Sequence, residues 1–336
     1  MNHSIQQIPI QQLNNGQFLE ITKHTFEFSV GPKIYLQANL HGAEIFGTFL
    51  LGRIIQKLKL LTSENILQNN IIGSLIIIPT ANPIAAQNTS YDSINGRWNP
   101  ISGTNWNRIF ETKKFKSKNE MNFFYQNQLE KENLSIEEKL AANLMLLSHD
   151  SYYIVDIHTT GRDTLTHIFS HPDSISFFQK LEPELNIFTT DIPPSPAFEN
   201  ANVWPLLDSE KPAVSCTWEV SCHNIIDLAE IETQEERLWN WLISVWSQET
   251  VQKIKKLSIK DTDCHHLIAP FGGYFSWTAK KGQIVKKDQA YATFYQPCND
   301  IFIQAKAEFD FILIAKYGIG AISQGQQIGL IGKIEA

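Results

Sequence analysis

Alternating strand and helix patterns dominate the first part of the sequence. Residues 34–40 and the continuous apolar run at residues 71–79 are typical of buried parallel strands. Between them, apolar side chains recur at helical spacing, at positions 45, 46, 49, 50, 54, 55 and 58. Residues 152–157 and 212–220 predict two further strands, and residues 232–257 predict an amphipathic helix. This order predicts an α/β fold with a largely parallel sheet flanked by helices.

The segments between these elements are mostly polar. Residues 82–110 form a polar loop, and loops of this length inside a compact domain are usually functional. Residues 111–133 are rich in charge and predict a solvated surface segment. Ser135 followed by Glu138 has the pattern of a capping box that opens a helix. No regular structure is expected around the prolines of a later segment, Pro193, Pro194 and Pro196.

The character of the sequence changes near its last quarter. Residues 265–336 contain short strand-like runs and frequent glycine, with no convincing helical pattern. A chain of 336 residues is also long enough for two domains. We therefore predict a first domain at residues 1–257 and a smaller, all-β second domain at residues 258–336.

Composition and charge exclude several classes of protein. The formal net charge is −7 and no large basic cluster is present, so nucleic-acid binding is not favoured. No run approaches the ~20 apolar residues of a membrane span, and the polar N-terminus lacks the features of a signal peptide, so a cytoplasmic location is expected. The four cysteines include no CxxC pair, which argues against a disulfide framework. Cys216 and Cys222 are interpreted as core thiols.

Candidate chemistry gathers at the predicted carboxyl ends of the strands. His41 and Glu44 follow the first strand, His158 ends a later one, and Glu219 lies near the end of the next. In an open α/β sheet, ligands bind at this edge, so distant residues can converge there. Two imidazoles and one carboxylate form a three-ligand zinc set that leaves a fourth position for water. A further carboxylate could then act as a general base. The alternative for each residue is a structural role in a turn or at a strand end.

Four motifs in this order carry a family resemblance: "HGAE", "NP…R…NR", "DIHT" and "TWEV". Together they resemble the succinylglutamate desuccinylase/aspartoacylase family of the zinc carboxypeptidase superfamily. The resemblance spans roughly residues 34–225 and continues at residues 265–336, which are similar to the barrel-sandwich C-terminal unit of many such deacylases. It implies a zinc carboxypeptidase-like fold with a mixed, largely parallel sheet, followed by that smaller all-β domain.

The resemblance also implies roles for individual residues. One Zn²⁺ per chain would be held by three ligands, His41, Glu44 and His158. Glu219 matches the glutamate that activates the zinc-bound water and carries the proton to the leaving nitrogen. Arg97 matches the arginine that polarises the scissile carbonyl group.

Two matches to the family pattern are incomplete. Asn107 and Arg108 match a pair that grips a substrate carboxylate, but Asn105 stands where the family has an acidic residue. Val220 and Ser221 follow Glu219, where the family commonly has glycine. These departures put the substrate in doubt more than the metal.

Other residues admit two readings each. Asp156 lies on the same side of its strand as His158, where it either supports that ligand or is a hydrogen-bonded buried acid. Arg162 is either a specificity residue or a solvated loop charge. Lys280 and Lys281 could mark a modified hairpin tip, as in biotinyl and lipoyl carriers, but ordinary turn lysines are favoured. The other histidines show no partner spacing: His3, His24, His149, His167, His171, His223, His265 and His266.

The resulting hypothesis is a zinc-dependent hydrolase that cleaves the amide bond of an N-acyl amino acid. One alternative is a metallocarboxypeptidase acting on short or cell-wall peptides. A second alternative is a binding module whose catalytic site has decayed. A small-molecule N-acyl amino acid or a short peptide is the expected partner, and the sequence is also compatible with a homo-oligomer.

Overall fold

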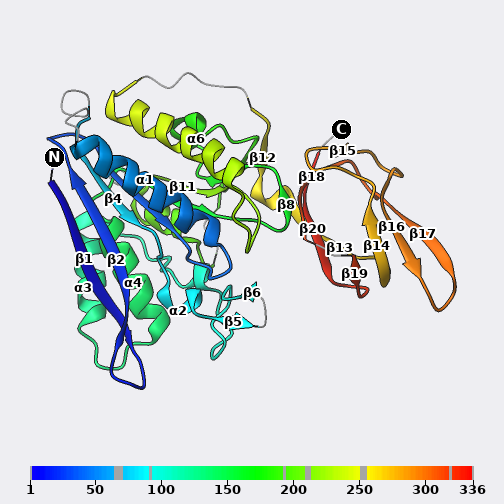
Figure 1. Cartoon of the computed structure of the whole chain (residues 1–336), viewed down its shortest axis with the longest axis horizontal. Coiled ribbons are helices and arrows are strands. Elements are labelled where there is room, and N and C mark those ends of the chain that lie inside the picture. Colours follow the sequence, from blue (N-terminus) through cyan, green and yellow to red (C-terminus); the bar gives the residue numbers. More distant parts are fainter. Residues whose placement is uncertain are drawn as a thin grey trace.

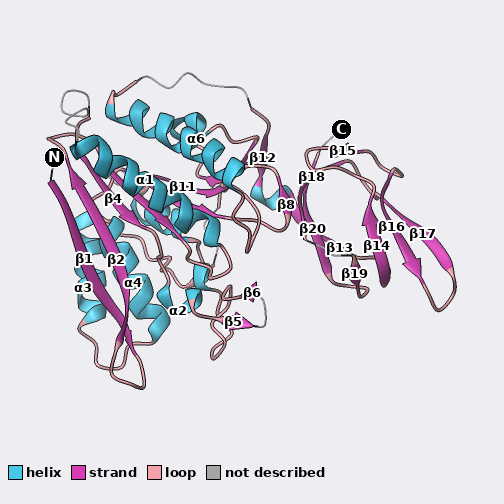
Figure 2. Ribbon diagram, in the orientation of Figure 1, coloured by secondary structure: helices cyan, strands magenta, loops and turns pink. Residues whose placement is uncertain are grey.

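A computed structural model describes residues 2–63, 71–90, 93–191, 194–208, 213–249, 256–317 and 320–334. These residues form an α/β region built on a large sheet, followed by a C-terminal region of antiparallel sheets (Figures 1 and 2). The predicted combination of a mixed α/β fold and an all-β C-terminal part is therefore confirmed. No helix within the described ranges is long and apolar enough to cross a membrane.

The large sheet contains nine strands in the part of the chain that the structure describes. In spatial order they are β1 (Asn2–Gln12), β2 (Phe18–Glu27), β4 (Ser74–Ile78), β3 (Lys33–Ala38), β7 (Tyr153–His158), β11 (Val214–Glu219), β9 (His167–Ser170), β10 (Leu185–Phe188) and β12 (Ser258–Lys260). The central strands β4, β3, β7 and β11 are parallel to one another. Their carboxyl ends therefore meet at one edge of the sheet, which is where the candidate residues were expected.

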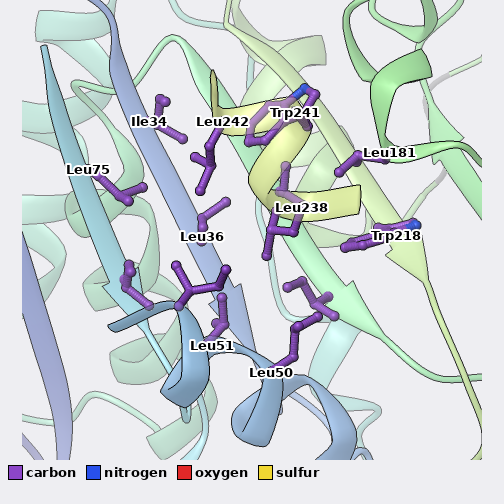
Figure 3. Packing of buried hydrophobic residues seen from close by; sticks show 14 of the residues in the cluster. Ile34, Leu36, Leu50, Leu51, Leu75, Leu181, Trp218, Leu238, Trp241 and Leu242 are labelled. Atoms are coloured by element: carbon purple, nitrogen blue, oxygen red, sulfur yellow. The ribbon is translucent and has the colours of Figure 1, made fainter. Parts of the chain in front are cut away.

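Helices cover both faces of this sheet. On one face lie α1 (Ile45–Ser63) and α6 (Leu228–Trp246), whose apolar side chains pack with β3 and β11 in the core shown in Figure 3. On the other face lie α3 (Lys118–Leu129), α4 (Ile136–Ser148) and the short α5 (Phe198–Val203). Burial of the sheet on both faces explains why its central strands read as continuous apolar runs.

Several expected elements are present and others differ. The capping box of Ser135 and Glu138 forms at the start of α4, as predicted. Most of residues 111–133 are exposed, as expected of a surface segment, but they include α3, which buries Met121 and Tyr125 against the sheet layer. The polar N-terminus forms the β1–β2 hairpin, which the sequence pattern did not predict. The helix expected at residues 232–257 begins earlier and ends at Trp246.

Short elements fill the predicted polar loop and the connections. The loop at residues 82–110 contains α2 (Pro83–Ala86), β5 (Thr89–Ser90), β6 (Ser93–Ile94) and a 3₁₀ turn at Trp106–Arg108. Further 3₁₀ turns are Ile175–Leu181, Trp204–Leu206 and Asp261–Asp263. Residues 194–197 show no regular structure, as expected, and Pro193 lies outside the described residues.

The C-terminal region consists of two antiparallel sheets around its own core. One contains β13 (Cys264–Ile268), β20 (Gln327–Lys333), β18 (Phe311–Lys316) and β15 (Ile284–Val285). The other contains β17 (Ile301–Lys306), β16 (Ala290–Gln296), β14 (Gly273–Trp277) and β19 (Ala321–Ile322). Phe294 and Leu313, one from each sheet, are fully buried between them.

The two regions share strands at their junction. β8 (Asp163–Thr164), from the loop after His158, pairs with β18 of the C-terminal region. Conversely, Ser258–Lys260 form β12 of the large sheet. Ile187, Ile259 and Ile314 join one buried cluster across the junction. The predicted domain boundary at residue 257 stays a prediction.

Two sequence interpretations concern side chains away from the sheet edge. Cys216 is buried on β11, as expected, but Cys222 is partly exposed in the loop beyond this strand, so its interpretation as a core thiol is wrong. The Lys281 ammonium group lies 3.3 Å from Asp163 Oδ1 and donates to the carbonyl oxygen of Thr164. This hairpin lysine holds the two regions together, which fits the favoured structural reading.

Candidate metal centre

The predicted ligands meet at the carboxyl edge of the large sheet. His41 and Glu44 lie in the loop between β3 and α1, and His158 is the last residue of β7. One ligand atom from each of the three side chains lies within 4.8 Å of the others, and all three residues are buried. His158 follows Glu44 by more than a hundred residues in the sequence, and the parallel pairing of β3 and β7 brings the two side chains together.

The carboxylate of Glu44 lies between the two imidazoles. Its Oε1 is 2.9 Å from His41 Nδ1, and its Oε2 is 2.8 Å from His158 Nδ1. The outer nitrogen of each ring faces another oxygen: His41 Nε2 is 2.9 Å from Asn105 Oδ1, and His158 Nε2 is 2.8 Å from Asp156 Oδ2. Each Nε2 therefore carries a proton and donates it to its oxygen partner. In a neutral ring the Nδ1 atom then has a lone pair, which points at Glu44.

Two lone pairs directed at one carboxylate require a positive charge between them. A proton on an Nδ1 atom supplies it in the metal-free protein, and a divalent cation supplies it otherwise. Histidine ligands of zinc commonly donate their second N–H to a carboxylate or carbonyl oxygen, which fixes the ring. The residues present therefore fit a zinc ion.

The three candidate ligands change one another's pKa values. Burial alone would raise the pKa of Glu44, but the His158 and His41 imidazoles hold it well below its ordinary value. Burial lowers the pKa of His158, yet Asp156 and Glu44 together raise it well above its ordinary value. Burial lowers the pKa of His41, and Glu44 offsets this only in part. Because zinc binds the neutral imidazole, metal binding would displace the proton from His158.

Close backbone packing shapes the turn that carries His41 and Glu44. The Gly42 amide donates to the carbonyl oxygen of Gly96 at 3.0 Å. A Cβ atom at position 42 would lie 2.0 Å from the carbonyl oxygen of Ala85, so only glycine fits there. The Asn39 side chain donates to the carbonyl oxygens of His41 and Gly42. The turn is thus fixed by the polar loop that follows β4.

Glu219 ends β11 directly beside His158, its register partner on β7. Its side chain is 9% exposed, and Thr160 Oγ1 donates to its Oε2 at 2.5 Å. Burial, followed by the charge of Glu44, raises the pKa of Glu219 to about 7, although His158, Thr160 and Arg97 pull it down. A carboxyl group with this pKa can exchange a proton near neutral pH.

The predicted substrate residues approach the site from the polar loop. Arg97 Nη1 lies 3.9 Å from Glu44 Oε1, and its side chain is 52% exposed. Asn107 is buried, and its Oδ1 accepts a hydrogen bond from the Phe198 amide at the start of α5. Arg108 is exposed and donates from Nη1 to the carbonyl oxygen of Asn107. The structure therefore places Arg97 beside the ligand set, while half of the Asn107 amide already has a structural partner.

Asp156 and Asn105 act behind the ligands. The carboxylate of Asp156 lies 2.8 Å from His158 Nε2, as expected of a supporting residue and also of a hydrogen-bonded buried acid. Asn105, which replaces an acidic residue of the family pattern, supports His41 in the same way. Arg162 is exposed, and its backbone N–H donates to the carbonyl oxygen of Lys316.

Sequence reasoning missed two residues beside the site. His223 Nδ1 lies 2.7 Å from Thr159 Oγ1, next to the candidate ligand His158. Its position four residues after Glu219 was the available signal. Tyr317 comes from the C-terminal region, and its ring lies against Gly161, where a Cβ atom would be 2.5 Å from Tyr317 Cδ1. Burial and the charge of Glu219 raise the pKa of Tyr317. No local pattern marks Tyr317.

The part of the chain that carries His41, Glu44 and His158 matches a known family. Residues 30–194 match the model of the succinylglutamate desuccinylase/aspartoacylase catalytic domain. Residues 30–194 belong to the succinylglutamate desuccinylase/aspartoacylase family. No curated protein matches the sequence of the chain.

Several solved structures share the fold over almost the whole chain. A protein assigned to this family from Shewanella frigidimarina is 18% identical with a TM-score of 0.86, covering 98% of this chain and 97% of its own. A family protein from Shewanella amazonensis is 19% identical with a TM-score of 0.85, covering 98% of both chains. The ectoine utilization protein EutE from Ruegeria pomeroyi is 17% identical with a TM-score of 0.71, covering 99% of this chain and 95% of its own. The C-terminal region is thus part of the shared fold.

Proposed function

We propose that this protein is a zinc-dependent hydrolase that cleaves the amide bond of an N-acyl amino acid. Membership of the succinylglutamate desuccinylase/aspartoacylase family supports an amide-hydrolase function. The observation that carries the zinc dependence is the arrangement of two imidazole Nδ1 atoms around the Glu44 carboxylate. We expect His41, Glu44 and His158 to hold one Zn²⁺ per chain.

Each neighbouring side chain has a place in the proposed reaction. A bound zinc ion supplies a Lewis acid and an acidified water molecule. Glu219 would accept the proton of the attacking water and deliver it to the leaving nitrogen, and its burial, which raises its pKa, favours this exchange. Arg97 donates to the carbonyl oxygen as negative charge develops on it.

The carboxylate of the substrate would bind at Asn107 and Arg108. The guanidinium group of Arg108 is exposed and matches the planar geometry of a carboxylate. The amide nitrogen of Asn107 complements it, because its oxygen is held by the Phe198 amide. The expected partner is therefore a small anionic molecule. The cytoplasmic location and a homo-oligomer stay predictions.

The C-terminal region favours a small substrate over a long peptide. Tyr317 packs on Gly161, and β8 pairs with β18, so this region lies directly against the loop after His158. The metallocarboxypeptidase alternative needs space for a peptide at the same place. The decayed binding module is disfavoured, since the ligand set and the outer partners of both histidines are complete.

The test is amine release from a panel of N-acyl amino acids and dipeptides, with and without a chelator. Cleavage of acyl amino acids that stops with chelator and returns with zinc would support the proposal. Cleavage confined to dipeptides would transfer the function to a carboxypeptidase. A protein with stoichiometric zinc that cleaves neither class would contradict a hydrolase with these substrates.

A further inference from the structure

The segment after Glu219 connects three loops of the site. Residues 221–224 follow β11 and include His223. Their backbone forms hydrogen bonds of 3.0 to 3.1 Å with Thr160, Gly161 and Ala43. The side chain of Asn224 both donates to and accepts from the backbone of Ile94. One short segment thus touches the loop after His158, the loop of His41 and Glu44, and the loop that leads to Arg97.

The imidazole of His223 has a defined tautomer in this arrangement. The Gly161 amide N–H donates to His223 Nε2 at 3.4 Å, so this nitrogen carries the lone pair. The proton of the neutral ring is therefore on Nδ1, which donates to Thr159 Oγ1 at 2.7 Å. His223 holds both ends of the Thr159–Gly161 turn.

Thr159 contacts the central ligand directly. Its backbone N–H donates to Glu44 Oε2 at 3.1 Å, the same oxygen that lies 2.8 Å from His158 Nδ1. The orientation of the Glu44 carboxylate therefore depends on the position of the Thr159 amide. That position depends in turn on the hydroxyl group that His223 holds.

We propose that His223 is a positioning residue, which fixes the metal-binding carboxylate of Glu44 through Thr159. The inference rests on the proposed metal site. It assigns His223 no contact with the substrate.

The test uses metal-free full-length protein and measures zinc affinity by competition with a chromophoric chelator. His223→Ala and Thr159→Val should each weaken zinc binding about tenfold, the range typical of an outer partner of a metal ligand. His223→Asn keeps a donor near the position of Nδ1 and should stay within about threefold of the wild type. The visible spectrum of the cobalt-substituted protein should change in the first two variants and not in His223→Asn.

A double variant distinguishes positioning from general damage. If His223 acts through Thr159, the loss in His223→Ala/Thr159→Val should equal that of either single variant, because residues in one chain of contacts are not additive. His171→Ala is the matched control, because His171 is also a partly buried loop histidine but follows β9 at the opposite edge of the sheet. Its zinc affinity should equal that of the wild type.

The outcomes separate the two proposals. A wild-type protein that binds no zinc would overturn the metal site and the inference together. Normal zinc binding by the wild type, His223→Ala and Thr159→Val would overturn the inference alone, as would losses that multiply in the double variant. If His223→Ala fails to fold, Thr159→Val and His223→Asn still give the comparison.

Discussion

Glu219 lies between two buried histidines that have opposite surroundings. It pairs in register with His158 on β7 and with His167 on β9. Both nitrogens of His158 contact carboxylates, from Glu44 and Asp156. His167 instead donates from Nδ1 to the carbonyl oxygen of Leu165 at 2.7 Å, and its Nε2 has no hydrogen-bond partner within the described ranges of the chain.

The difference appears in their proton affinities. Burial lowers the pKa of both imidazoles, but the two carboxylates raise that of His158 well above its ordinary value. Without a carboxylate partner, the pKa of His167 falls to about 4. A candidate ligand and a core histidine are therefore both buried and both lie beside Glu219, although His158 ends its strand and His167 begins its own. Their hydrogen-bond partners distinguish them.

The largest expected effect lies on the His158 side of Glu219. Glu219→Gln should reduce kcat on the order of 10³-fold, because the amide cannot accept the proton of the attacking water. Zinc content, measured by mass spectrometry, should stay at one ion per chain. Wild-type kcat/KM should rise with pH through the pKa of Glu219, which bound zinc would shift below its metal-free value of about 7.

One control variant and two contrary results test the assignment of Glu219 as the general base. His167→Asn, on the other side of Glu219, should keep kcat within about threefold of the wild type, since it changes a core contact only. Near-full activity of Glu219→Gln would remove the general base from the mechanism. Loss of zinc from this variant would show that the glutamate is a ligand instead.

The second prediction concerns stability and the neutral state of His167. Its folded pKa of about 4 is below the unfolded value of 6.5, so its contribution is complete above pH 6.5 and is lost as pH falls toward 4. The shift corresponds to about 3 kcal/mol of unfolding free energy. His167→Asn keeps a donor to Leu165 but does not titrate. In urea unfolding of metal-free protein at pH 7 and pH 4, the wild type should lose about 3 kcal/mol more than the variant. Equal losses would contradict the buried neutral histidine.

The third prediction concerns the loop after His158, which packs against the C-terminal region. Gly161 has a φ of 65°, and an added Cβ would meet Tyr317 at 2.5 Å. Gly16 has a similar φ of 85° with no atom within 4 Å of the added Cβ. Gly16→Ala should cost about 1 kcal/mol from backbone strain alone. Gly161→Ala should cost about 1–3 kcal/mol more, because overpacking adds to the strain. The added Cβ would also meet the backbone oxygen of Lys316 at 2.6 Å, so equal changes in thermal unfolding would show that both the Tyr317 ring and this backbone move freely.

Much of the site was predictable because parallel strands bring their carboxyl ends together. His41, Glu44, His158 and Glu219 each stand at such an end, and the structure joins the first three in one cluster. The partners behind them were harder to predict. Asp156 was readable from strand alternation, whereas the contact of Asn105 with His41 depends on the folding of a long loop.

The missed features depend on contacts between distant segments. His223 and Tyr317 contact Gly161 from separate loops. β8 is only two residues long and pairs with β18 in a sheet of the C-terminal region. α3 was hidden because few of its residues are buried, although Ser117 caps it through the Glu120 amide. β1 is mostly exposed, so its side chains give no apolar alternation.

The most direct test of the account is a zinc titration of the metal-free wild type, His158→Gln and His167→Asn. The first variant removes Nδ1 but keeps an amide facing Asp156, and the second keeps the donor to Leu165. We expect one zinc ion per chain, bound with equal affinity by the wild type and His167→Asn. His158→Gln should bind at least about 100-fold more weakly, at or beyond the upper limit for loss of an outer partner. Unchanged zinc affinity in His158→Gln, or an equal loss in His167→Asn, would contradict it.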